Sequence, residues 1–366
     1  IQGSTMPVNQ QVMLPEMIDK IAYELMSPEQ IKAFEATWEM NLSFGLPKVG
    51  NFRVNIFRQR GSISIVVRFI LGNIPELDDL GLPPVLADMI MEKRGLILIV
   101  GATGSGKSTT IASMLDHRNA NRSGHILTVE DPIEFLFKHK KSIVNQREIG
   151  MDTVDWNSAL KNAMRQAPDC ILIGEIRDKE TMQAAIAYAQ TGHLCLATLH
   201  ANNSYHALNR IISFFPLENR AALFLDLSVA LRAIVSQRLV KKPDGKRSPT
   251  CEVMLNTRHI SELIERGEVQ AIKDAMEQTL APGSQTFEQD LFRLFRENVI
   301  TLDEALANAD SPTNLSWLIN NSELTTTSSK EEKKIDTALE FDSTNLGGTS
   351  FKEFSLSLSD TDEETT

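Results

Sequence analysis

The segment from Gly101 to Ser108 reads GATGSGKS, a set of glycines, lysine and serine that can hold a phosphate chain. The apolar run Leu96 to Val100 precedes it and apolar residues at helical spacing follow it, which is the strand, loop and helix setting of a P-loop. The glycines let successive N–H groups point at phosphate, Lys107 reaches the β- and γ-phosphate oxygens, and the Ser108 hydroxyl can ligate Mg²⁺. We therefore expect ATP and Mg²⁺ here, rather than a glycine-rich turn without nucleotide. The predicted nucleotide-binding residues of this loop are Gly101, Ala102, Thr103, Gly104, Ser105, Gly106, Lys107, Ser108 and Thr109.

Acidic residues follow two further apolar runs. Glu130, Asp131 and Glu134 come after the first of these runs, and Glu175 ends the second, CILIGE. Ligands of parallel α/β sheets bind at the carboxyl ends of strands, so these carboxylates can face the nucleotide. Glu175 can hold Mg²⁺ directly or through water, because this ion keeps several waters and takes few protein ligands. Taken singly, each acid is equally well explained as a helix N-cap or a surface charge.

Two histidines flank the run GHLCLATLH, with His193 before it and His200 directly after it. An imidazole at the carboxyl end of a strand can donate to the γ-phosphate and so respond to hydrolysis. The alternative for each is a structural histidine, and for His193 the residues do not separate the two interpretations.

The elements that must position these residues are short apolar runs, LILIV, HILTV, CILIG and LCLATL, separated by helical patterns. Runs that are apolar on both faces and alternate with helices predict a parallel sheet covered on both sides. The fold class is therefore α/β, with this P-loop core assigned to residues 95–321 and its C-terminal helices included.

A smaller α/β domain is predicted over residues 1–72, followed by a linker over 73–94. Ser27, Pro28 and Gln30 form a capping-box pattern ahead of a helix with Ile31, Phe34 and Trp38 on one face. The segments 51–58 and 62–70 alternate apolar and polar residues around Gly61, the pattern of a hairpin. Because the chain starts at Ile1, we expect this domain to be truncated at its start.

Residues 322–366 hold 11 acids against four lysines and no long apolar period, so we predict a disordered acidic tail. Its segment FKEFSLSLSD is a candidate docking motif, although a solvated tail is the simpler interpretation. The basic segment 238–247, RLVKKPDGKR, is predicted to be an ordinary exposed turn rather than a partner-docking patch.

Composition bounds the class of protein. The 366 residues are 42% hydrophobic and 23% charged, as in a water-soluble globular protein, and the net charge of −11 argues against sequence-independent binding to nucleic acid. The three cysteines form no CxxC pair, which predicts neither disulfides nor a zinc site and favours buried thiols in a reducing compartment. No apolar run approaches the roughly 18 residues of a transmembrane helix, and no leader is expected.

Together GATGSGKS, VEDPIE, GEIRD and GHLCLATLH resemble the Walker A, Asp box, Walker B and His box of secretion ATPases. The resemblance runs from about Val12 to about Asn314 and is strongest to the type IV pilus retraction ATPases PilT and PilU. Pilus extension and type II secretion ATPases usually carry a four-cysteine zinc insert, which three cysteines cannot supply. PilT-like proteins carry an AIR-x-LI motif where this chain reads RHISELI, Arg258 to Ile264, which favours the PilU branch.

This resemblance implies a PAS-like N-terminal domain, a RecA-like core and a hexameric ring that retracts pili and drives twitching motility. The implied location is the cytoplasmic side of the inner membrane at the pilus base. The implied partners are a sister PilT-like motor and the inner-membrane platform protein of the pilus, without nucleic acid or a transmembrane segment. Two alternatives remain open: a RecA-like nucleic-acid translocase, and a nucleotide-binding coupling subunit without independent motor activity.

The resemblance also implies residue roles. Glu134 would be the general base that orients water, Glu175 the carboxylate on the Mg²⁺ side, and His193 and His200 parts of the sensor box. Arginines of the N-terminal domain would reach a nucleotide, and the matching positions are Arg53, Arg60 and Arg68, with Arg58 of less certain alignment. The alternative for these arginines is a solvated hairpin face.

Overall fold

The structure is a computed structural model that describes residues 6–7, 10, 12–46, 49–70, 73–279 and 281–321. The chain divides into two compact units, Ile1–Ser316 and Trp317–Thr366. Of the second unit only residues 317–321 are described, and they are helical. The predicted acidic tail and its FKEFSLSLSD segment lie outside the described residues.

The N-terminal part of the first unit is a three-stranded antiparallel sheet with two helices. Its elements are α1 (Pro15–Leu25), α2 (Pro28–Thr37), β1 (Glu39–Leu46), β2 (Gly50–Gln59) and β3 (Ser62–Ile70). The alternating sequence puts Val54, Ile56 and Ile63 inward, where they pack with Ala22 and Phe34 of the helices. The predicted hairpin is confirmed as β2 and β3, and the sheet strand β1 was missed.

The capping box that the sequence predicts is present at the start of α2. Gln30 N donates to Ser27 Oγ over 3.3 Å, and Ser27 N donates to Gln30 Oε1 over 2.9 Å. The prediction that Trp38 continues the buried face is wrong. The helix ends at Thr37, and Trp38 follows in a left-handed conformation with φ 64°, which turns its side chain out to 62% exposure.

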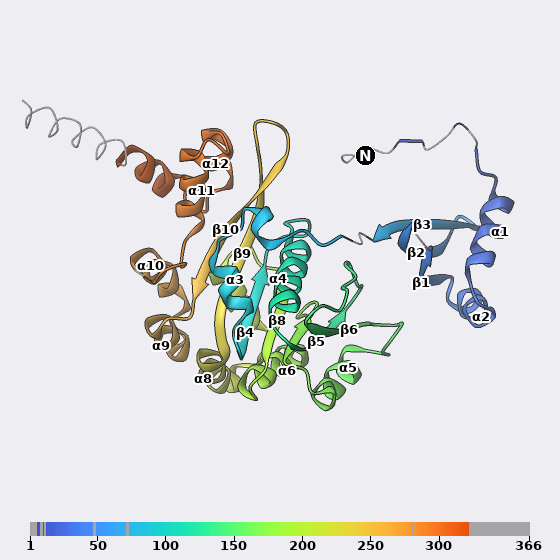
Figure 1. Cartoon of the computed structure of the whole chain (residues 1–366), viewed down its shortest axis with the longest axis horizontal. Helices are drawn as coiled ribbons and strands as arrows, with labels where there is room; N and C mark the ends of the chain where they lie inside the picture. Colours follow the sequence, from blue (N-terminus) through green and yellow to red (C-terminus); the bar gives the residue numbers. More distant parts are fainter. Residues whose placement is uncertain are drawn as a thin grey trace, which may run out of the picture. The chain divides into compact units, whose positions relative to one another are not determined.

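The main sheet has seven strands in the order β10-β9-β4-β8-β7-β5-β6, all parallel except the antiparallel edge strand β10. Figure 1 shows these strands side by side in the centre of the core. The strands are β4 (Gly95–Val100), β5 (Gly124–Glu130), β6 (Ser142–Glu148), β7 (Cys170–Ile173), β8 (Leu194–Leu199), β9 (Leu231–Lys241) and β10 (Arg247–Leu255). The four predicted apolar runs are confirmed as β4, β5, β7 and β8.

Helices cover both faces of this sheet. Alternate residues of a strand point to opposite faces, and these alternate residues belong to two separate apolar clusters, each of which includes helices. One cluster joins the sheet to the 3-10 helix η1 (Leu77–Leu80), α3 (Val85–Ile90) and α4 (Lys107–Asn121). The other joins it to α5 (Trp156–Ala163), α6 (Lys179–Gln190), α7 (Ser204–Ser213), α8 (Arg220–Ala230), α9 (Arg258–Arg266) and α10 (Ile272–Gln278). Two further helices follow α10 in the chain, α11 (Phe287–Arg296) and α12 (Leu302–Asn308).

The stretch expected as a linker, residues 73–94, is largely part of the core. It contains η1 and α3, and their residues Leu77, Leu86, Met89 and Ile90 are buried in the cluster that also holds α4. The apolar spacing of these residues is the signal that was overlooked.

Buried Arg118 of α4 ties the P-loop helix to the segment that enters β4. Its guanidinium donates to Ile90 O over 2.6 Å and to Glu92 O over 2.9 Å, and Arg122 Nη1 donates to Met91 O over 2.7 Å. These bonds satisfy carbonyls at the C-terminal end of α3, a position where cations are stabilising. They fix the segment that leads into β4 against the helix that follows the loop.

Within the described part of the chain, no helix combines the length and apolar character that crossing a bilayer requires.

Candidate functional site

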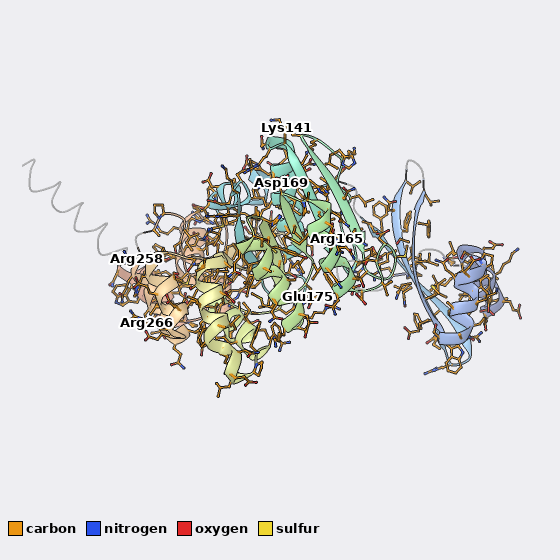
Figure 2. All side chains as sticks on the ribbon, turned by 90° about the horizontal axis from the view of Figure 1, so that it is seen from below. Lys141, Arg165, Asp169, Glu175, Arg258 and Arg266 are labelled. Atoms are coloured by element: carbon orange, nitrogen blue, oxygen red, sulfur yellow. The ribbon has the colours of Figure 1, made fainter. Side chains whose placement is uncertain are left out.

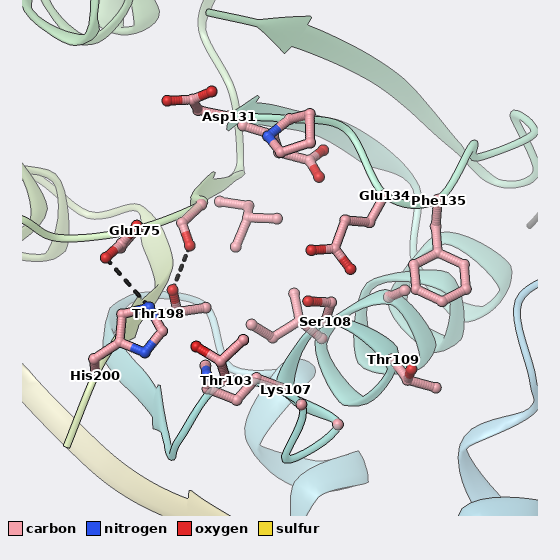
Figure 3. A pocket seen from close by; sticks show the side chains of 18 of the residues that line it. Thr103, Lys107, Ser108, Thr109, Asp131, Glu134, Phe135, Glu175, Thr198 and His200 are labelled. Atoms are coloured by element: carbon pink, nitrogen blue, oxygen red, sulfur yellow. Dashed lines mark hydrogen bonds and ion pairs between the residues drawn. The ribbon is translucent and has the colours of Figure 1, made fainter. Parts of the chain in front are cut away.

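A cavity of about 610 Å³ lies where β4, β5, β7 and β8 end. Its lining combines the loop after β4 with side chains from the other three strand ends, as Figure 3 shows. In the sheet, β8 and β7 separate β4 from β5, so the loop and the acids after β5 face each other across two strands. The lining includes the predicted residues Thr103, Gly104, Gly106, Lys107, Ser108, Thr109, Glu130, Asp131, Glu134, Glu175 and His200.

The three glycines between Gly101 and Gly106 have backbone angles that only glycine adopts without strain. Gly104 and Gly106 have φ 80° and 90°, and a Cβ on Gly101 would lie 2.5 Å from Gln237 O. Helix α4 starts at Lys107, so the N–H groups of its first turn have no partner within the helix. Ser105 Oγ is buried without a hydrogen-bond partner among the described residues. These features fit a bound phosphate chain.

Lys107 lies inside the cavity. Its ammonium donates to Gly101 O and Ala102 O, each over 2.9 Å. Burial lowers the pKa of Lys107, while the nearby carboxylates Glu175 and Glu134 raise it. The lysine is therefore held by its own loop and lies near both carboxylates.

The acids after β5 and β7 have different surroundings. Glu175 Oε2 accepts from Arg177 Nε over 2.8 Å, and Glu175 Oε1 lies 3.4 Å from His200 Nε2. Arg177 Nη1 also lies 3.3 Å from Asp131 Oδ2, so one guanidinium joins the two acidic segments. In Figure 3 the Glu134 carboxylate points into the cavity toward Ser108. The predicted placement of carboxylates opposite the P-loop is present in this geometry.

Glu130 is held differently from Glu134. Its Oε1 accepts from Thr128 Oγ1 over 2.7 Å and from Gln146 Nε2 over 3.2 Å. Burial raises the pKa of Glu130 to about 7, although these hydrogen bonds act in the opposite direction. Glu130 is therefore a carboxyl fixed in the wall.

We expect Glu130→Gln to flatten the pH dependence of thermal stability. The pKa of about 7 in the folded protein exceeds the ordinary glutamate pKa of 4.5, so the contribution of Glu130 to stability is fully present below about pH 4.5 and is lost as the pH rises through about 7. Glutamine is neutral throughout and still accepts from Thr128 and Gln146. Melting curves between about pH 5 and about pH 8 should show wild type falling below Glu130→Gln by a few degrees at the upper end. Parallel curves would contradict the buried, protonatable state of Glu130.

The two histidines of the His box lie at opposite ends of β8. His200 follows the strand and lines the cavity, with half of its side chain exposed. His193 precedes the strand, where its backbone N donates to Tyr188 O over 3.1 Å and its O accepts from Gly95 N over 3.0 Å. The six residues of β8 lie between them, and seven steps of roughly 3.3 Å separate the two histidines by about 23 Å. The cavity of this chain therefore gives no support to the predicted nucleotide contact of His193.

The three predicted arginines do not form one group. Arg53 and Arg68 are direct register partners in β2 and β3, whereas Arg60 lies in the turn that joins these strands. Seven residues at roughly 3.4 Å each put Arg60 about 24 Å from Arg53 along the hairpin. Arg68 borders the cavity. Arg58 instead pairs with Glu35 over 3.1 Å and stacks on Phe34.

Sequence reasoning missed two polar residues in the site. Thr198 of β8 donates from Oγ1 to Gly174 O beside the cavity, and the only signal was a hydroxyl inside an apolar run. Gln237 of β9 is 2% exposed and contacts the P-loop, and its signal was a glutamine within the apolar pattern of a strand.

The segment 238–247 is only partly the exposed turn that was predicted. Residues 242–246 form a turn between β9 and β10, but Arg238 is half-buried within β9. Its guanidinium lies 3.9 Å from the Phe287 ring centre and pairs with Asp310. Arg238 therefore belongs to the packing of α11 and α12 against the sheet.

The segment 258–264 forms the first turns of α9 and lies away from the cavity. Ile260, Leu263 and Ile264 are buried on the sheet side, and Arg258 is exposed with Glu262 at 3.0 Å. Figure 2 shows Arg258 and Arg266 at one end of the core, at a distance from Glu175. This segment therefore does not line the cavity of its own chain.

The donor set of the cavity suits a magnesium nucleotide. Ser108 and Glu175 offer oxygen ligands in the same cavity as the phosphate loop. Among the described residues, no group of three or more His, Cys, Asp or Glu side chains is arranged to hold a metal. Mg²⁺ bound by few protein ligands needs no such group, because phosphates and water complete its octahedron. The three cysteines are free and buried, as predicted.

Comparisons with known proteins agree with this geometry. A family model described as "Type II/IV secretion system protein" matches residues 38–290. The chain is 47% identical to the type IV pilus ATPase PilU of Pseudomonas aeruginosa, over 87% of this chain and 84% of that protein. It is 38% identical to the retraction ATPase PilT of the same organism, over 86% of this chain and 91% of that protein.

The fold has close solved counterparts as well. A crystal structure of the pilus retraction motor PilT with bound ADP superposes with a TM-score of 0.77 at 43% identity, covering 81% of this chain and 85% of that one. The Legionella pneumophila ATPase DotB superposes with a TM-score of 0.70 at 25% identity, covering 83% and 86%. The predicted resemblance is confirmed, and the chain belongs to the type II/IV secretion ATPase family, in the group of the type IV pilus ATPases PilT and PilU.

Proposed function

We propose that this protein is an ATP-hydrolysing motor that retracts type IV pili and thereby drives twitching motility. We further propose that it acts as a PilU-like accessory to a sister PilT-like motor. The observation that carries the proposal is one cavity that unites a P-loop with carboxylates from two other strands, in a chain 47% identical to PilU. The AIR-x-LI difference at Arg258 to Ile264 supports the accessory role.

In the proposed site, the loop N–H groups and Lys107 hold the phosphates of ATP. Ser108 and Glu175 would hold Mg²⁺, directly or through water, and a bound ion would supply positive charge beside the phosphates. Glu134 orients the attacking water and accepts its proton, because its carboxylate points into the cavity. His200, next to Glu175, responds to the γ-phosphate.

In the proposed assembly, six subunits form a ring on the cytoplasmic side of the inner membrane, at the platform protein of the pilus base. The proposed site calls for a second cation to meet charge that develops on the γ-phosphoryl group. Arg177 is already paired with Glu175 and Asp131, and Arg68 borders the cavity of its own chain. Arginines of a neighbouring N-terminal domain would supply this cation, as arginine fingers do in other P-loop enzymes.

The test of the proposed function has a biochemical and a cellular part. Purified protein should hydrolyse ATP only with Mg²⁺, and DNA should not stimulate it, since the net charge of −11 disfavours a polyanion. Strong stimulation by DNA would instead indicate a translocase. Pilus retraction is then imaged in cells that lack this protein, the sister motor or both. If the protein is an accessory motor, retraction should be weaker in cells that lack it. Unchanged retraction in those cells would contradict the accessory role. Binding of ATP without turnover would identify a coupling subunit.

A further inference from the structure

Gln237 is a buried amide that joins the P-loop to a distant part of the sequence. It lies on β9, which pairs with β4, the strand that leads into the loop. Its side chain is 2% exposed, although glutamine is usually a surface residue. A buried amide is costly unless its donor and acceptor are both satisfied, so its partners indicate its role.

Both ends of the amide are used, and both partners belong to the nucleotide loop and its helix. Gln237 Nε2 donates to Ser105 O over 3.0 Å, and Gln237 Oε1 accepts from Thr110 Oγ1 over 2.8 Å. Two glycines of the loop pack so closely against Gln237 that a side chain at either position would collide with it. A Cβ on Gly106 would lie 2.8 Å from Gln237 Nε2, and one on Gly101 would lie 2.5 Å from Gln237 O.

The hydrogen bond to Ser105 O also fixes the direction of the next N–H group, that of Gly106. The peptide between Ser105 and Gly106 is planar and trans, so its C=O and N–H point in opposite directions. With Ser105 O directed at Gln237, the N–H of Gly106 must point away from β9. Gly106 caps α4, and N–H groups at this position bind anions.

We propose that Gln237 is a positioning residue for nucleotide binding, which orients the peptide between Ser105 and Gly106 so that the Gly106 N–H faces the phosphates. The inference rests on the proposed nucleotide site and adds a residue that lies 132 positions beyond Ser105 of the P-loop. Without the bond from Gln237, this peptide would turn more easily, because it reorients by rotation about ψ of Ser105 and φ of Gly106, and glycine permits both signs of φ.

The strand that carries Gln237 is itself well anchored. Residues 237 and 238 alternate across the sheet, and Arg238 donates to Asn308 O and to Asn202 O and pairs with Asp310 on the other side. The amide of Gln237 is therefore presented from a fixed backbone, as a positioning role requires.

The experiment measures the Kd of full-length protein for fluorescent N-methylanthraniloyl-ADP. Gln237→Met keeps a similar volume but cannot donate to Ser105 O. Gln237→Glu keeps an acceptor for Thr110, and its ionised carboxylate cannot donate, so it is measured well above the pH at which a buried glutamate is protonated. We expect both to raise the Kd about tenfold, the scale of one charge-assisted hydrogen bond, while turnover at saturating ATP changes less. Gln285→Ala is the matched control, because Gln285 Nε2 also donates to a backbone carbonyl, Cys251 O at 2.8 Å, outside the cavity lining.

Each outcome decides one point. If wild type and Lys107→Ala bind the probe equally weakly, the proposed nucleotide site is wrong. If wild type binds, Lys107→Ala does not, and folded Gln237→Met and Gln237→Glu bind like wild type, the nucleotide site stands and the positioning role is wrong. An equal loss in Gln285→Ala also overturns it, since then the loss of any side-chain amide bonded to a backbone carbonyl would produce the effect. Retained binding in Gln285→Ala together with the tenfold loss in both Gln237 variants supports it.

Discussion

Replacing Lys107, Glu134 or Glu175 by alanine is expected to lower Mg²⁺-dependent ATP hydrolysis by at least about 100-fold, because each removes a charge that the transition state requires. The three side chains line one cavity, and both carboxylates lie near enough to raise the pKa of Lys107 against the effect of burial. Steady-state phosphate release by purified protein measures the loss. Nucleotide affinity should fall for Lys107→Ala and remain for Glu134→Ala, since of these two side chains only that of Lys107 holds the phosphates of bound ATP before hydrolysis.

Glu180→Ala is a suitable control for these variants. Glu180 is exposed on α6, a few residues beyond Glu175, and it does not line the cavity. Its removal should leave turnover near the wild-type rate. A folded Glu134→Ala variant with near wild-type turnover would remove Glu134 from the proposed role of base and would make Glu130 the candidate. Glu130→Ala measured in parallel then decides between the two acids.

Motifs that depend on neighbouring residues could be predicted from the sequence. The P-loop setting, the capping box at Ser27 and Gln30 and the apolar runs of the parallel strands are all present in the structure. These features arise from local backbone preference and from side-chain period, which a short window contains. Trp38 shows the limit of the same rule, because a helical period does not say where the helix ends.

Features that depend on sheet order could not be predicted in this way. The sequence places Glu130 and Glu134 together, and only the fold separates a carboxyl fixed in the wall from one directed into the cavity. The separation of His193 from His200, by contrast, follows from the sequence, because the strand between them places the two residues at its opposite ends. Gln237 reaches Ser105 because β9 is adjacent to β4 in the sheet. These two strands are far apart in the sequence, so no short stretch of sequence indicates their pairing.

The arginine prediction is the one with the largest expected effect on turnover. Removal of an arginine finger typically costs 10³-fold or more in rate, with a smaller effect on ATP affinity than loss of the P-loop lysine. The hairpin register refines which residues to test. Arg53 and Arg68 are cross-strand partners and form no ion pair among the described residues, so they can act as a pair, whereas Arg60 is too far along the hairpin to join them. We therefore expect Arg53→Ala and Arg68→Ala to lose turnover and Arg60→Ala to retain most of it.

Mixed rings determine whether these arginines act on a neighbouring subunit. Arg53→Ala or Arg68→Ala protein, inactive alone, is mixed with inactive Lys107→Ala protein, and ATP turnover is measured after verified subunit exchange. With an arginine acting in trans, a Lys107-containing core next to an intact hairpin from the Lys107→Ala subunit forms a complete site, so turnover should return. With an arginine acting within its own chain, every site keeps one defect and the mixture stays inactive. Since Arg68 borders the cavity of its own chain, an inactive mixture would assign it to that site and refute the trans mechanism. Full turnover by an isolated monomer would refute it equally, because no neighbour is then needed.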